Sequence, residues 1–151
     1  MIDAIAPTHI LSITLPGRSY LGPTGFPSDR HLFVSFDDVD DVAASNGPDE
    51  DMVRRILDFA RAIPADGKLL IHGLLGVRRS AAVALGLLAD RLPPEEAAQV
   101  LTRFCSQPPD PQPGVLALFD GVLSLDGALV AASSNRFVQG RNAIRRRSAD
   151  V

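Results

Sequence analysis

The sequence predicts an α/β protein with a small, mostly parallel sheet flanked by helices. Three short apolar runs, His9–Leu15, His31–Phe36 and Lys68–His72, indicate strands. Patterns typical of helices follow the second and the third of these runs, and from Ser80 onward helical patterns dominate. Strands that alternate with helices early in a chain favour a parallel sheet, because parallel neighbours need a crossover connection.

The first half of the chain supports this assignment element by element. The run His9–Leu15 is apolar and β-branched, and a loop rich in Gly and Pro follows it over 16–27. The run His31–Phe36 has apolar residues at every second position, which is strand periodicity. After an acidic stretch, Pro48 and three carboxylates indicate the first turn of a helix. Apolar residues then recur at helical spacing until the turn at 64–67.

The second half predicts one more strand and then helices. The run Lys68–His72 is compact and apolar, which is typical of a strand buried on both faces. The segment Ser80–Leu92 is apolar almost all round and predicts a central helix covered by others. An amphipathic helix follows up to Phe104, a proline-rich break covers 107–114, and Val115–Leu125 predicts another helix. Residues 127–132 extend that helix or begin a last one.

Length, charge and cysteine content narrow the class of protein. The 151 residues fit one domain, 1–151, with a basic tail that we expect to fray over 133–151. The net charge of −3 argues against a general nucleic-acid binder. One cysteine, Cys105, allows no disulfide within the chain. Because the sequence shows neither a basic-apolar leader nor a run of about 20 apolar residues, we expect a cytoplasmic protein with no membrane contact.

The segment between the third predicted strand and the central helix has the features of an anion site. Ligands of α/β proteins bind where a parallel strand gives way to a helix, whose first N–H groups are unpaired. Gly76 lets successive N–H groups point inward, Arg79 can give a phosphate two parallel hydrogen bonds, and Ser80 can cap the helix or donate its hydroxyl. The alternative is an ordinary turn in which Arg79 points to solvent.

The stretch IHGLLGVRRSAA, residues 71–82, resembles the signature of the protein tyrosine phosphatase superfamily, His-Cys-x5-Arg-Ser/Thr. The likeness is closest to the small dual-specificity-like branch found in bacteria, and it covers about Thr8 to Ala132. It implies a phosphatase-like fold with a strand–phosphate loop–helix unit. His72 matches the signature histidine, a structural support of the loop, while Gly76, Arg79 and Ser80 match the loop glycine, the phosphate-binding arginine and the hydroxyl residue.

The resemblance also implies a general acid, but the sequence departs from the family signature at the nucleophile. HLFVSFDDV is similar to the strand before the family's acid-bearing loop, with Asp38 the better match and Asp37 the runner-up. Position 73, which carries the attacking cysteine in the family, is Gly73, so the covalent route is closed. We interpret Cys105 as a core thiol. Without the thiolate, the loop lacks a negative charge that would repel a bound dianion, which favours tighter phosphate binding. Glycine raises the entropic cost of ordering the loop, which weakens binding, and the sequence does not show which effect is larger.

These features predict a pseudophosphatase that binds phosphate or a phosphorylated ligand, such as a phosphoprotein, with little or no hydrolysis. The peptide N–H groups would come from the loop and the helix start, and the sequence indicates no cofactor and no metal. The residues predicted to bind phosphate are Gly73, Leu74, Leu75, Gly76, Val77, Arg78, Arg79 and Ser80. The side chain of Arg78 either adds charge at the mouth or points to solvent.

Two alternatives stay open at this point. One is a phosphatase that uses direct water attack, with Asp37 or Asp38 as acid or base. Asp37, Asp38, Asp40 and Asp41 could also suggest Mg²⁺, although a solvated loop explains such a cluster equally simply. The other alternative is that Gly73 arose after function was lost, or was introduced by design. The sequence does not indicate an oligomeric state, and Arg145–Arg147 belong to the predicted tail.

Overall fold

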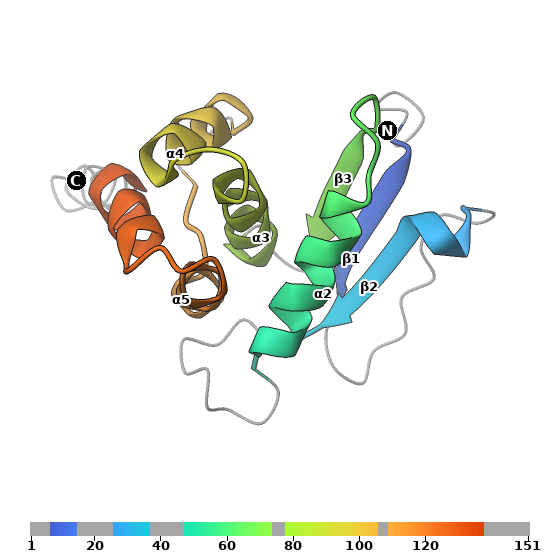
Figure 1. Ribbon diagram of the computed structural model, residues 1–151, viewed down its shortest axis with the longest axis horizontal. Coiled ribbons are helices and arrows are strands. Elements are labelled where there is room, and N and C mark those ends of the chain that lie inside the picture. Colours follow the sequence, from blue (N-terminus) through green and yellow to red (C-terminus); the bar gives the residue numbers. More distant parts are fainter. Residues whose placement is uncertain (1–6, 15–25, 37–46, 74–77, 106–108, 138–151) are drawn as a thin grey trace, which may run out of the picture.

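The computed structural model describes residues 7–14, 26–36, 47–73, 78–105 and 109–137. Its sheet consists of β1 (His9–Thr14), β2 (His31–Ser35) and β3 (Leu69–Gly73) in the order β2-β1-β3, with both pairs parallel (Figure 1). The prediction of an α/β protein with a small parallel sheet is therefore confirmed.

Five helices accompany the sheet in the described ranges, and a further helical stretch covers 128–137. In Figure 1, α2 lies in front of the strands, while α3, α4 and α5 form a separate group beside them. The helices are η1 (Ser28–Arg30), α2 (Glu50–Arg61), α3 (Arg78–Ala89), α4 (Pro94–Arg103) and α5 (Pro113–Val122).

Helix α2 begins at the acidic residues that predicted its first turn. The Asp49 side chain accepts a hydrogen bond from the Met52 N–H at 2.8 Å, which satisfies one of the unpaired donors at the helix start. Carboxylates occupy the first turn and Arg61 the last, which suits the helix dipole. The apolar stripe is buried, so α2 is anchored to the core by one face.

The core lies between the sheet and the helices. Leu11 and Ile13 of the central strand β1 are buried in one cluster with Val34 and Phe36 and with the apolar faces of α2, α3 and α5. Helix α3 is central, as predicted, because it contacts β3, α4 and α5. Gly86 allows α3 to pack closely on α5, since a Cβ on that residue would lie 2.4 Å from the ring of Phe119.

A buried carboxylate joins α5 to the last helical stretch. Asp120 is 5% exposed and accepts hydrogen bonds from the N–H groups of Gly127, Leu129 and Val130 at 2.7, 2.9 and 3.2 Å. These donors lie at the start of the stretch 128–137, where helical N–H groups have no partner within the helix. Asp120 therefore acts as a cap from outside that helix.

Two predictions about the second half need correction or restriction. The expectation that β3 is buried on both faces is wrong, since all five of its residues are half-buried and β3 is an edge strand of the described sheet. The predicted tail 133–151 is described only to residue 137; that part is helical and Phe137 is buried. Within the described ranges no helix is both long and apolar enough to cross a membrane.

Candidate functional site

The strand and the helix of the predicted strand–loop–helix unit are both among the described elements. Gly73 is the last residue of β3, and α3 begins at Arg78. The intervening loop residues 74–77 lie outside the described residues, so the predicted roles of Leu74, Leu75, Gly76 and Val77 stay predictions. The same holds for Asp37 and Asp38, because 37–46 is also outside the described residues.

Arg79 is buried at the carboxyl edge of the sheet. Its side chain is 1% exposed, and Nη1 donates hydrogen bonds to the carbonyl oxygens of Phe36 at 2.8 Å and Thr14 at 3.3 Å. The guanidinium carbon also lies 5.7 Å from the centre of the Phe36 ring. The alternative in which Arg79 points to solvent is therefore wrong.

These contacts bring the ends of two strands, β1 and β2, to one charged group. Thr14 ends β1, Phe36 directly follows β2, and Gly73 ends β3, so Arg79 lies where the carboxyl ends of parallel strands meet. The two carbonyls fix the plane of the guanidinium, whose five N–H donors have a rigid fork geometry that matches phosphate. A buried cation is costly unless it is hydrogen-bonded, and the carbonyls of Thr14 and Phe36 supply such bonds to Arg79.

Arg78 contacts a segment that sequence reasoning did not connect with the site. Its Nε lies 3.3 Å from Asp110 Oδ2, with each side chain 33% exposed, and its carbonyl accepts a hydrogen bond from Gln112 N–H at 3.1 Å. The buried Gln112 also caps α5, because its side-chain oxygen accepts from Val115 N–H at 2.7 Å. A polar residue before Pro113 is the sequence signal that could have revealed this cap.

His72 belongs to a chain of hydrogen bonds across the sheet. The hydroxyl of Ser12, which is fully buried on β1, lies 2.7 Å from His72 Nε2 and 2.8 Å from His31 Nε2. Burial lowers the pKa of both imidazoles below 6.5, and the neighbouring His72 lowers the pKa of His31 further. These hydrogen bonds link His72, the residue before Gly73, to Ser12 of β1 and through it to His31 of β2. The supporting role of His72 stays a prediction, and the contact with Ser12 shows which group His72 would use.

Two remaining predicted residues have simple surroundings. Ser80 lies in the first turn of α3 and is half-buried. Cys105 follows the end of α4, where it is half-buried against the core, and burial raises the pKa of its thiol. A raised pKa lowers the fraction of the reactive thiolate form.

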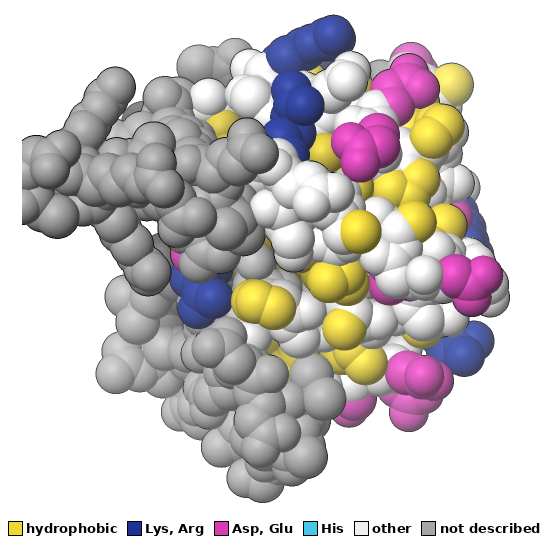
Figure 2. Space-filling view, turned by 90° about the vertical axis from the view of Figure 1, so that its left-hand side faces the viewer, with side chains coloured by type: hydrophobic (Ala, Val, Ile, Leu, Met, Phe, Trp, Pro, Cys, Tyr) yellow, Lys and Arg dark blue, Asp and Glu magenta, His cyan; other side chains and the backbone are white. Residues whose placement is uncertain are grey.

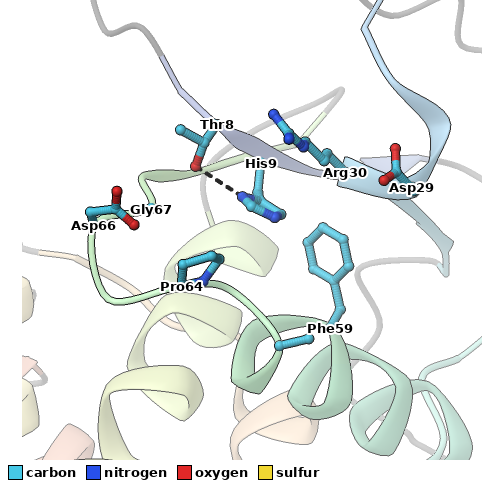
Figure 3. A pocket seen from close by; sticks show the side chains of 9 residues that line it. Thr8, His9, Asp29, Arg30, Phe59, Pro64, Asp66 and Gly67 are labelled. Atoms are coloured by element: carbon cyan, nitrogen blue, oxygen red, sulfur yellow. Dashed lines mark hydrogen bonds between the residues drawn. The ribbon is translucent and has the colours of Figure 1, made fainter.

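A separate cavity of about 520 Å³ opens at the opposite, amino edge of the sheet (Figure 3). His9 stands in it between Phe59, whose ring centre is 5.8 Å away, and the Thr8 hydroxyl, which is 2.9 Å from its Nδ1. Asp29, Arg30 and Asp66 contribute charges of both signs to the lining. In the described part of the chain, no three His, Cys, Asp or Glu residues come together as metal ligands.

No model of a known protein family matches the chain, and no curated protein is similar to it.

Proposed function

We propose that this chain is a phosphatase-like protein that binds phosphate or a phosphorylated ligand without hydrolysing it by the covalent route. The observation that carries the proposal is the buried Arg79 guanidinium at the carboxyl edge of the sheet, bonded to the carbonyls of Phe36 and Thr14. The relation to the protein tyrosine phosphatase superfamily and a cytoplasmic location belong to the same proposal.

The chemistry follows from the two ends of the loop. Gly73 has no side chain, so nothing at the end of β3 can attack a phosphorus atom. The positive end of the α3 dipole lies at Arg78, directly after the loop, and it favours a dianion there. Arg79 supplies a full charge whose orientation the strand ends fix. Binding and catalysis are thereby separated: an oxygen-rich anion is held, and no nucleophile meets it.

A titration of the protein with inorganic phosphate tests the proposal. Calorimetry should show one saturable site, and Arg79→Lys should weaken it about tenfold or more, because an ammonium cannot make two parallel hydrogen bonds. Arg54→Lys is the matched control, since Arg54 is exposed on α2 and paired only loosely with Glu50, at 3.6 Å. Equal phosphate binding by wild type and Arg79→Lys would refute the site.

Restoring the nucleophile tests the phosphatase-like part of the proposal. We expect Gly73→Cys to form a trappable phosphocysteine with an aryl phosphate, while the wild-type protein gives no turnover at any pH. An inert Gly73→Cys variant that still binds phosphate would support an anion site unrelated to phosphatases. Turnover by the wild type that depends on Asp38 would instead establish direct water attack.

A further inference from the structure

The outer edge of β3 has no neighbouring strand among the described residues. Thr8 N–H and His9 N–H donate to the Lys68 carbonyl at 2.9 and 3.1 Å, so this carbonyl points toward β1. Because backbone groups alternate in direction along a strand, Leu69 and Ile71 direct their N–H and C=O groups away from β1. Among the described residues no strand lies on that side.

An apolar groove of about 620 Å³ adjoins this edge. Its floor and walls come from β3, the end of α2, α3 and α4, and they include Leu69, Ile71, Ala84, Leu87 and Leu88. Phe104, 81% exposed, lies at its α4 side. Figure 2, which looks onto the side of the molecule that carries α4, shows hydrophobic side chains exposed among charged ones. Since Leu69 and Ile71 face the groove, a strand added beside β3 would insert every second side chain into it.

The charges around the groove are positive on balance, which favours an acidic occupant. Arg61, Asp90 and Arg91 line it, and Arg61 and Asp90 neutralise each other through two hydrogen bonds of 2.9 and 2.7 Å, so Arg91 is the remaining charge in the lining. Three exposed charged residues are sequence neighbours of lining residues, the cations Lys68 and Arg103 and the carboxylate Asp66. A second copy of β3 would bring another Lys68 and no carboxylate, so the groove suits a different partner.

We propose that the edge of β3 and this groove bind an extended segment of a partner protein, with apolar side chains at alternate positions and carboxylates at its ends. Proteins usually protect edge strands with charges, prolines or bulges, and the sequence LLIHG of β3 has none of these. Main-chain hydrogen bonds to Leu69 and Ile71 supply the affinity, while the groove and its cations select the sequence.

The probe is a fluorescein-labelled peptide, acetyl-EVTVTVE-amide, whose binding is followed by fluorescence polarisation. We expect saturable binding to the wild-type protein and binding about tenfold weaker or worse for the control acetyl-KVTVTVK-amide. Ala84→Glu places a carboxylate in the groove and should abolish binding of the acidic peptide. Phe33→Ser, which removes an exposed phenyl ring on β2, should leave it unchanged.

Backbone methylation distinguishes strand addition from simple apolar contact and uses only the wild-type protein. Methyl groups on the valine amides block pairing with β3 if the peptide runs antiparallel, and methyl groups on the threonine amides block it if the peptide runs parallel. One pattern should abolish binding and the other should spare it. Equal binding of both methylated peptides overturns the proposal, as does a dimer that the peptide dissociates.

Discussion

Replacement of Arg79 by Met tests whether the guanidinium joins the strand ends. Met keeps most of the apolar stem and loses the donor of the 2.8 Å bond to Phe36 O and the 3.3 Å bond to Thr14 O. A hydrogen bond that involves a charged group contributes about 1.5–3 kcal/mol, and the longer bond counts at the low end or below. We therefore expect the free energy of unfolding to fall by about 2–4 kcal/mol.

Urea unfolding followed by circular dichroism measures this change, with equal m-values as the sign that the unfolded states are comparable. Arg79→Lys should lose less, since an ammonium keeps the charge and can reach a carbonyl. A stability of Arg79→Met within about 0.5 kcal/mol of wild type, the usual range for surface changes, would refute the idea that Arg79 holds the strand ends together.

Three further changes test other parts of the structure. Gly86→Ala should destabilise the protein by about 1–3 kcal/mol, because the new methyl group meets the Phe119 ring; a stabilised variant in urea unfolding would contradict this close helix contact. Asp120→Ala removes the acceptor of three N–H bonds and should cost about 3 kcal/mol, with amide exchange at 127–130 accelerated. Burial lowers the folded-state pKa of His31 and His72, so the unfolded chain binds more protons as the pH falls through about 6.5. The free energy of unfolding should therefore be highest above that pH and decrease below it. The variant His72→Gln should show a weaker dependence of melting temperature on pH.

Local patterns in the sequence were sufficient for the elements whose signals are local. Alternation in β2, the carboxylates at the start of α2 and the all-round apolar surface of α3 each depend on residues close in the chain. They predicted the α/β class, the parallel arrangement and the position of the strand–loop–helix unit.

Contacts between distant segments could not be found in this way. The Ser12 hydroxyl meets His31 and His72 only because three strands align in register, and a serine in an apolar run gives no local sign of it. The apolar run of β3 predicts a strand buried on both faces, because apolar side chains alone do not show how completely other segments cover them.

The same limit applies to the candidate site. The signature predicted that Arg79 lies at the mouth of a helix, but its burial depends on the carbonyls of Thr14 and Phe36, which come from other strands. Asp110 contacts Arg78 across more than thirty residues of chain, and the proline-rich break that contains it was assigned no role in the site.

A crystal structure of the wild-type protein soaked in inorganic phosphate tests the central claim most directly. The account predicts a tetrahedral anion between Gly73 and the start of α3, surrounded by peptide N–H groups of 74–79 and within hydrogen-bond distance of the Arg79 guanidinium. A loop whose N–H groups diverge, or one whose centre is filled by another side chain while phosphate is in excess, would contradict it.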